Sequence, residues 1–350
     1  MKATIKDVAK KAGVSLATVS RILNESGYFD EETGRRVREA VAALGYRRNV
    51  HWTRLKRNTS ETVCFLLGNR DAMNSMQMRM LVACEGVLRE KGMDVVFTGM
   101  RYGSEQRSAQ IARPRMLAED GIVDGVVLTG QHHANLLGVF ERMGMPYVLA
   151  ANNFTGKPAL TKRNAVIYDD RTACDEAVRY LARLGHKRVA FAGNIAYPWF
   201  RRRYEGYAEA AGQLRLTPIE VTDDWQVNSI EYGRLATAQL LRHPNGPTAV
   251  LAANDEVAAG VWKELVHRGV RIPGEISLIG FGDREEFSIL EPSLTSISVY
   301  PDKLGAELAR MLLRRLADPA AEEAAKVFPC QLMERASCGP APRQLQAVRG

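Results

Sequence analysis

The first regular pattern in the chain reads Thr4-Ile5-Lys6-Asp7-Val8-Ala9-Lys10-Lys11-Ala12-Gly13-Val14-Ser15. Its apolar residues recur at the spacing of one helix face, and Thr4 followed by Asp7 resembles a capping box. Gly13 supplies a turn residue that tolerates positive φ, and Ser15 can cap a second helix. The stretch therefore predicts two short helices joined by a tight turn, which is the helix-turn-helix arrangement.

The residues that follow supply a small core for these two helices. A third helix should open near residues 30–32. At helical spacing the second and third helices would bury Val19, Ile22, Leu23, Val37, Ala40, Val41 and Leu44. Three short helices of this kind can enclose a minimal core.

The outward side of the second helix mixes small and hydrogen-bonding residues with one arginine. Such a face fits a DNA major groove, where Arg21 can read guanine edges and short side chains allow close approach. Lys2, Lys6, Arg47 and Arg48 are better placed for phosphates. The residues predicted to contact DNA in this segment are Thr4, Ser15, Leu16, Ala17, Thr18, Ser20, Arg21 and Asn24. From the pattern alone, a three-helix interaction bundle with a solvated polar face remains an alternative.

The positive charge of the chain is concentrated at its start. Residues 1–60 hold 13 Lys and Arg against 6 Asp and Glu, so they carry +7 of the total charge of +8. A basic module on a nearly neutral body suits a contact with a polyanion, because neutralised phosphates release counterions.

Other classes of protein lack support in the composition. The N-terminus shows no apolar signal segment, and the apolar runs are strand-length, far short of the roughly 20 residues of a membrane span. The five cysteines are scattered without metal-ligand spacing, and no phosphate-binding loop or nucleophile motif appears. We therefore expect a cytoplasmic protein that is not an enzyme, with no catalytic residues, no metal and no cofactor.

From Val63 onward short apolar runs alternate with amphipathic stretches, which is the pattern of parallel sheets covered by helices. The expected strands are 63–67, 94–98, 125–128, 147–150, 166–168, 188–192, 219–222, 249–252 and 276–280. In the first half, helices are expected near 76–91, 105–119 and 134–143. The fold class is α/β, with a helix-turn-helix headpiece and a two-lobed core of parallel sheets.

Seams near 151–163 and after Ser288 predict two crossings between the lobes. The expected domains are a headpiece at 1–47, a hinge at 48–60, a body at 61–338 and a tail at 339–350. Within the body, lobe 1 would take about 61–151 and 290–318, and lobe 2 about 164–288 and 326–338. Ligands of open parallel sheets bind outside the carboxyl ends of the strands, so two facing lobes predict an enclosed site.

The headpiece strongly resembles that of the lactose-repressor (LacI/GalR) family, through residues 4–15, 18–24 and Leu44-Gly45-Tyr46. The resemblance implies that the second helix reads bases through Leu16, Ala17 and Arg21. The family's hinge motif matches only in part. Asn49 and Leu55 fit it, whereas Arg48 replaces a proline and Trp52 an alanine. Leu55 is implied to wedge into the minor groove.

The body carries the same resemblance, over a span of about residues 3–338. It implies a core similar to periplasmic sugar-binding proteins, an effector site and a dimer formed through the lobes. The motifs that carry it include Asp124-Gly125-Val126-Val127, residues 184–191, Arg203-Tyr204-Glu205-Gly206-Tyr207, Ala253-Asn254-Asp255, Ile279-Gly280-Phe281-Gly282-Asp283 and residues 292–295. Carried over by position, effector contacts fall on Asp71, Asn74, Arg101, Asn152, Arg203, Trp225, Asn254 and Asp255.

One departure concerns the ligand. Where sugar-responsive members often have an aspartate, this chain has Ala150-Ala151-Asn152-Asn153, which argues against an ordinary hexose. Arg101, Tyr102 and the two asparagines offer other polar groups. The tail 340–350 has no heptad repeat, so a dimer is expected rather than a coiled-coil tetramer.

Taken together, the sequence predicts a transcriptional regulator, a repressor by resemblance, that binds a palindromic double-stranded operator as a homodimer. A small ligand, a sugar or sugar derivative, would control it. An enzyme on a doubly wound fold and a transport-type binding protein are the other classes, and neither accounts for the basic headpiece.

Overall fold

The computed structural model describes residues 3–23, 28–46 and 59–342 and divides the chain into two compact units, residues 1–60 and 61–350. The predicted residues Lys2, Asn24, Arg47, Arg48, Asn49, Trp52 and Leu55 lie outside the described residues, as does most of the tail. No helix among the described residues is long and apolar enough to cross a membrane.

The first unit is the predicted three-helix headpiece: α1 (Ile5–Ala12), α2 (Leu16–Leu23) and α3 (Glu31–Leu44). Thr4 and Asp7 form the expected capping box, and Gly13 ends α1 with φ 66°. The Ser15 hydroxyl accepts the Thr18 N–H at 3.0 Å and so begins α2. Val8, Val19 and Val37 are fully buried in a core that these three helices share.

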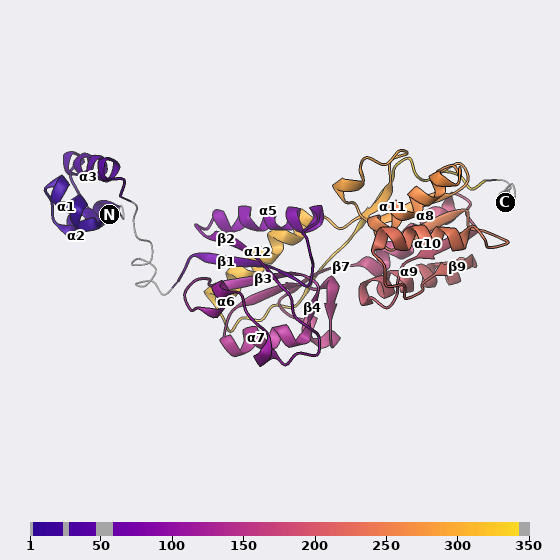
Figure 1. Ribbon diagram of the computed structural model, residues 1–350, viewed down its shortest axis with the longest axis horizontal. Coiled ribbons are helices and arrows are strands. Elements are labelled where there is room, and N and C mark those ends of the chain that lie inside the picture. The colour runs from indigo at the N-terminus through magenta and orange to yellow at the C-terminus, as the bar shows by residue number, and fades with distance from the viewer. Residues whose placement is uncertain (1–2, 24–27, 47–58, 343–350) are drawn as a thin grey trace. The chain divides into compact units, whose positions relative to one another are not determined.

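The second unit consists of two lobes, each built on a six-stranded sheet (Figure 1). The lobe 1 sheet has the order β13-β7-β5-β3-β1-β2 and is wholly parallel. The lobe 2 sheet has the order β14-β12-β11-β10-β8-β9, and its edge strand β14 alone is antiparallel.

The elements of the first lobe and of the crossings occur in chain order as follows. They are β1 (Thr62–Gly68), α5 (Ser75–Arg89), β2 (Asp94–Met100), η1 (Ser108–Gln110), α6 (Arg115–Ala118), β3 (Gly125–Gly130), β4 (His132–His133), α7 (Ala134–Met143), β5 (Tyr147–Ala150), η2 (Ala151–Asn153), β6 (Phe154–Thr155), η3 (Pro158–Thr161), β7 (Ala165–Tyr168), α12 (Pro301–Ala317) and β13 (Lys326–Phe328). The second lobe contains α8 (Asp170–Arg183), β8 (Arg188–Ala192), α9 (Pro198–Gln213), β9 (Thr217–Val221), α10 (Ser229–Leu240), β10 (Ala249–Ala252), α11 (Asp255–His267), β11 (Ser277–Gly282), η4 (Glu285–Phe287), β12 (Thr295–Ser298) and β14 (Gln331–Met333).

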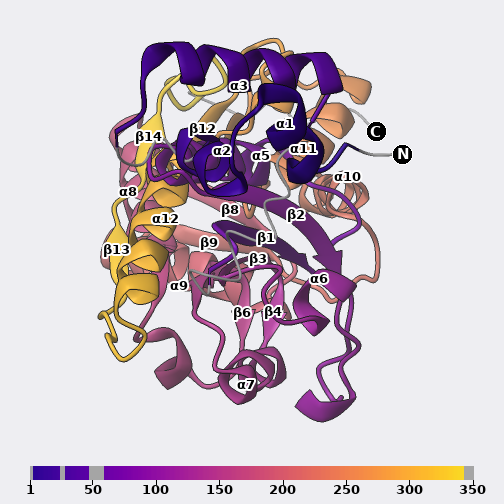
Figure 2. The same cartoon turned by 90° about the vertical axis from the view of Figure 1, so that its left-hand side faces the viewer.

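Helices cover both faces of each sheet, because alternate residues of the strands point to opposite sides. In lobe 1, Val63 and Phe65 pack into one core with α5 and α12, whereas Cys64 and Leu66 pack into another with α7. Figure 2 shows α7 on the opposite side of the sheet from α5 and α12. In lobe 2, α8 and α9 cover one face, and α10 and α11 cover the other.

The expected lobe boundaries need correction. Strand β7, expected in lobe 2, pairs with β5 and β13 in the lobe 1 sheet, and β12, expected in lobe 1, pairs with β11 in lobe 2. Strand β13 also belongs to lobe 1. The chain therefore crosses three times, after β7, β12 and β13; the two expected seams marked only the first two crossings, and each crossing lies later in the chain than its expected boundary. A short apolar run predicts a strand, but it does not specify the sheet that the strand joins.

The helix expected over 105–119 is also wrong in its extent. The structure has only a 3₁₀ turn at Ser108–Gln110 and a single helical turn at Arg115–Ala118. Pro114 explains the break, since its ring fixes φ and disfavours helical backbone in the residue before it. Pro114 instead precedes the first residue of α6.

The contact between α8 and α9 gives a test of the fold. Gly206 lies where α9 meets α8, and a Cβ at this position would overlap the backbone carbonyl of Arg171. We expect Gly206→Ala to lower the free energy of unfolding by about 1–3 kcal/mol, because the backbone cannot move aside cheaply. Gly212→Ala in the same helix is the matched control, since a Cβ added there would meet no heavy atom within 4 Å. Urea unfolding should show Gly212→Ala neutral or stabilised by up to about 1 kcal/mol, and equal effects of the two changes would contradict the close approach.

Candidate DNA interface and ligand site

The exposed face of α2 presents the side chains that the sequence predicted. Leu16 is 44% exposed, and Ala17, Ser20 and Arg21 are also exposed, whereas Thr18 is half-buried. An apolar tip, a methyl group, a hydroxyl and a guanidinium therefore lie on one side of a single helix. This combination suits contacts with thymine methyl groups and with guanine edges.

Two of the residues predicted to contact DNA, Thr4 and Ser15, also make bonds within the headpiece. The Thr4 hydroxyl donates to the Asp7 carboxylate at 2.7 Å, and hydrogen bonds from Thr4 lower the pKa of Asp7. The Ser15 hydroxyl lies 2.8 Å from that of Thr18, in addition to its capping bond. These side chains hold the ends of α1 and α2, so any contact with a phosphate would come in addition to this role.

A pocket in lobe 1 lies at the carboxyl ends of β3, β5 and β7. Its lining comes from these strands and from α5 and α12, and it includes Gln77, Thr129, Asn152, Asn153 and Tyr168. It holds about 390 Å³ of space outside the protein atoms, part of it open to solvent. The carboxyl ends of the strands are the place where open parallel sheets bind ligands.

Asn152 borders this pocket, but its amide is already engaged. Its Oδ1 accepts the Tyr168 N–H at 2.9 Å, and its Nδ2 donates to the Tyr168 carbonyl at 2.8 Å. The side-chain amide therefore bonds to the β7 backbone at Tyr168 in the way that the backbone of a neighbouring strand would. A contact between this amide and an effector stays a prediction, and it would have to use the second N–H or the second lone pair of the amide.

Arg203 is buried where the two lobes meet, in contrast to its exposed neighbour Arg201. Its guanidinium donates to the Ala253 carbonyl at the end of β10 and to the Tyr168 hydroxyl at 3.2 Å. The same group lies 3.6 Å from the ring centroid of Phe281, a cation–π contact. Arg203 thus connects α9 and the lobe 2 strands to the end of β7 in lobe 1.

The neighbouring Arg202 makes a second link between the lobes. It pairs with Asp170 at 2.8 Å and donates to the backbone carbonyl of Asn152 at 2.7 Å. Burial opposes the charge of Arg202, but the interaction with Asp170 outweighs it and raises the pKa of the guanidinium.

Asn254 and Asp255 begin α11 on the lobe 2 side of this junction. Asn254 caps the helix through the Val257 N–H at 2.8 Å. Asp255 is fully buried and accepts bonds from the Ser296 hydroxyl at 2.6 Å and the Arg284 N–H at 2.8 Å. Burial raises the pKa of Asp255 to about 6, against these hydrogen bonds, which lower it. Asp255 borders a second cavity, confined to lobe 2, together with Asp283, Ser296 and Arg335.

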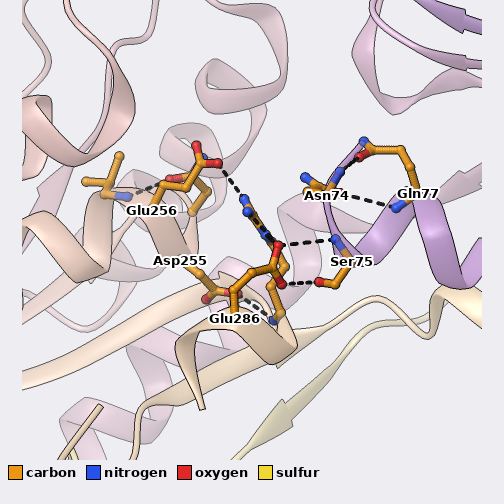
Figure 3. Close-up of polar contacts among 9 residues, drawn as sticks. Asn74, Ser75, Gln77, Asp255, Glu256 and Glu286 are labelled. Carbon is orange, nitrogen blue, oxygen red and sulfur yellow. Dashed lines mark hydrogen bonds and ion pairs between the residues drawn. The ribbon is translucent and has the colours of Figure 1, made fainter. Parts of the chain in front are cut away.

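A chain of charged contacts joins the two lobes directly (Figure 3). Glu286 of lobe 2 accepts the backbone N–H of Ser75 at 3.1 Å and the hydroxyl of the same residue, at the first turn of α5 in lobe 1. Arg284 pairs with Glu286 at 2.9 Å and with Glu256 at 2.7 Å. Burial acts to raise the pKa of Glu286, but the bonds from Ser75 and Arg284 outweigh it and lower the pKa to about 2. We call the contact between Ser75 and Glu286 the interlobe contact.

The remaining predicted residues fall into three places. Asn74 caps α5 through the Gln77 N–H at 3.2 Å and lies beside the interlobe contact (Figure 3). Asp71 and Arg101 pair with each other at 2.8 Å, with the Asp71 side chain 98% exposed. Trp225 packs against the ring of Tyr232 at 5.1 Å in the lobe 2 core. The structure therefore brings Asn74, Arg203, Asn254 and Asp255 to the junction between the lobes.

Sequence reasoning missed Tyr168, Arg284, Glu286 and Arg70 at this junction. Arg70 and Arg284 each follow the end of a buried strand by two residues, a position at which polar side chains reach a ligand site of parallel sheets. That signal was present in the sequence. The pairing of Glu286 with Ser75, 211 residues apart, left no such signal.

Comparison with known protein families matches two parts of the chain. Residues 4–49 match the model of bacterial regulatory proteins of the lacI family, and residues 178–338 match that of a periplasmic binding protein-like domain. These ranges include the three helices of the headpiece and most of lobe 2.

Curated relatives align over nearly the whole chain. The ribose operon repressor of Escherichia coli (strain K12) is 31% identical over 342 residues, which are 96% of this chain and 99% of the relative. The HTH-type transcriptional repressor CytR of the same strain is 29% identical over 339 residues, 96% of each chain.

Solved structures share the arrangement of these elements. The lac repressor dimer bound to operator and the anti-inducer ONPF superposes with a TM-score of 0.81 at 25% identity, over 97% of this chain and 100% of that one. The transcriptional regulator CelR in complex with cellobiose gives a TM-score of 0.68 at 25% identity, over 96% and 99%. With a helix-turn-helix headpiece, two parallel-sheet lobes and these relatives, the chain belongs to the LacI family of DNA-binding transcriptional regulators and is not an enzyme.

Proposed function

We propose that this regulator is a repressor that binds a palindromic operator as a homodimer and that a small carbohydrate-like ligand at the junction of the lobes changes its operator affinity. The observation that carries the proposal is the exposed face of α2, with Leu16, Ala17 and Arg21 on one side of a helix that a capped turn holds against its neighbours. Such a face has the dimensions and chemistry of a major-groove reader.

Dimerisation is supported by apolar residues exposed on lobe 1. Met78 and Val82 lie one turn apart on α5, 49% and 62% exposed, and Phe97 on the edge strand β2 is 46% exposed. A two-fold dimer would present two headpieces to two half-sites, which is why the operator should be palindromic. The lac repressor, to which this chain is similar, was crystallised as a dimer on operator.

The ligand is proposed to bind in the lobe 1 pocket and to reach the junction. Asn74, Arg203, Asn254 and Asp255 remain the proposed polar surroundings, with Arg203 and Asp255 acting mainly by holding neighbouring groups in place. Asp71 and Arg101 pair with each other and Trp225 packs on Tyr232, so ligand contacts by these three residues stay predictions. CelR, another similar protein, was crystallised with cellobiose. We also expect the protein to act in the cytoplasm, where its five cysteines, all free thiols, stay reduced.

Operator affinity should reside in the headpiece. The two units have separate cores, so a chain that begins at Ser60 should fold, keep its ligand and lose operator binding. Gel-shift titration at moderate salt measures the DNA affinity, and thermal shift confirms the fold of the truncated chain. Operator binding by the truncated chain would place the DNA interface in the lobes.

Arg21 should contribute sequence preference rather than general affinity. We expect Arg21→Ala to cost about 1–3 kcal/mol on the operator and to relax the preference at one base pair of each half-site. Lys6→Ala, a change at an exposed residue of α1, should weaken binding to all sequences about equally. Binding to a library of operator variants separates the two outcomes, and a uniform loss in Arg21→Ala would mean that Arg21 touches phosphate.

The interlobe contact should set the equilibrium between arrangements of the lobes. Glu286→Gln removes the charge that the first turn of α5 and Arg284 stabilise, so the lobes should separate more readily and the unliganded protein should scatter as a larger particle. Glu285→Gln, at the exposed neighbouring position, is the matched control. Small-angle X-ray scattering gives the radius of gyration, and operator titrations with and without ligand give the change in coupling, which is typically about 1–3 kcal/mol in total. An unchanged radius and unchanged coupling in Glu286→Gln would show that this contact does not control the lobes.

A further inference from the structure

Three buried N–H groups near the junction have no hydrogen-bond acceptor among the described residues. They are Nδ2 of Asn69, Nε of Arg70 and Nε of Arg203, of which the last lies 3.8 Å from an oxygen of Asp170. Buried polar groups in proteins nearly always have a partner, and exceptions call for a cause. Since all three are donors, the group missing from this place is an acceptor.

The turn after β1 fixes two of these donors. Asn69 has φ 47°, a left-handed conformation that asparagine tolerates better than most residues. Its backbone N–H donates to the Met100 carbonyl at 2.9 Å, and its Oδ1 accepts the Tyr102 N–H at 2.9 Å. The amide oxygen is thereby used within the turn, and Nδ2 has no acceptor among the described residues.

The charge of Arg70 is not neutralised by the protein. Burial lowers the pKa of Arg70, Glu256 and Tyr168 act in the opposite direction, and the charges of Arg284 and Arg203 lower it further. Arg70 makes no ion pair within 4 Å among residues 3–23, 28–46 and 59–342. The nearby acids have other partners, because Glu256 pairs with Arg284 at 2.7 Å and Asp170 pairs with Arg202 at 2.8 Å.

We propose that the effector carries an anionic group, a carboxylate or a phosphate, that binds Arg70 and Asn69 beside Tyr168 at the edge of the lobe 1 pocket. The inference rests on the proposed function and specifies its ligand class as a sugar acid or sugar phosphate rather than a neutral sugar. An oxyanion supplies both the missing acceptors and the missing negative charge, and a guanidinium binds it through two parallel hydrogen bonds. Tyr168 connects this site to Arg203 and hence to lobe 2.

The test compares Arg70→Gln with Arg115→Gln, which changes an arginine that is 86% exposed on α6 and pairs with Glu119. The first measurement needs no ligand. If Arg70 is a half-buried cation awaiting a partner, the unliganded Arg70→Gln protein should melt at the same temperature as the unchanged protein or higher, because a partly desolvated charge without a partner has been removed. A clear fall in melting temperature would mean that Arg70 supports the fold, and it would overturn the proposal.

The second measurement uses defined probes on the full chain at constant ionic strength: inorganic phosphate, glucose, glucuronate and glucose 6-phosphate. We expect at least one anionic probe to raise the melting temperature of the unchanged protein and of Arg115→Gln, with an affinity at least tenfold weaker in Arg70→Gln. Comparison of glucuronate with glucose 6-phosphate distinguishes a carboxylate from a phosphate. Stabilisation by glucose that is independent of Arg70 would overturn the anionic ligand while leaving the ligand site itself in place.

Two further outcomes also count against the inference. Equal stabilisation of Arg70→Gln and the unchanged protein by the anions would place their site elsewhere, and no stabilisation by any anionic probe would overturn the proposed ligand class. Operator binding, measured in the same samples, reports on the proposed function separately, because Arg70 lies outside the headpiece.

Discussion

The contacts of the Arg203 guanidinium are the interactions on which the arrangement of the two lobes depends. It is buried with only 5% of the residue exposed, and its bonds reach the end of β10, the hydroxyl of Tyr168 and the face of Phe281. A buried cation is tolerated only when hydrogen bonds and opposite charge compensate for its lost hydration. Most of that compensation comes from lobe 2, through the Ala253 carbonyl, the Phe281 ring and the carboxylate of Asp170 at 3.8 Å. Lobe 1 contributes the Tyr168 hydroxyl, which therefore lies between the pocket and lobe 2.

The headpiece and most strands were predictable because their signals are local. The capping box at Thr4, the turn at Gly13 and the helical spacing of Val8, Val19 and Val37 each depend on residues within a few positions along the chain. The strands at 188–192 and 249–252 likewise follow from short apolar runs between helices. The sheet to which β7 belongs was not predictable in this way. Its partners β5 and β13 are separated by more than 170 residues, and nothing in Val166 to Tyr168 distinguishes one buried parallel sheet from another.

The polar residues of the site show the same limit. A polar side chain after a strand predicts a ligand contact, but whether its bonds are already used depends on neighbours distant in sequence. Asn152 binds the backbone of Tyr168, and Asp255 binds Ser296 and the backbone of Arg284, so both are occupied in the folded protein. Arg70 is the opposite case. In the sequence it is one arginine among many, whereas in the structure its Nε has no hydrogen-bond partner among the described residues.

The three crossings also determine the order in which parts of the chain can fold during translation. Lobe 1 takes α12 and β13 from the far end of the chain. A ribosome that has released β1 to β5 has therefore produced a sheet that lacks β7, the edge strand β13 and one of the two helices that cover the Val63 and Phe65 face. That apolar face is not fully covered until α12 ends at residue 317, after all the helices of lobe 2. The headpiece is complete within its first 46 residues and depends only on local contacts, which form quickly. Nascent chains would therefore carry a folded DNA-binding unit ahead of an unfinished regulatory unit, and the exposed lobe 1 sheet is the part most in need of a chaperone during translation.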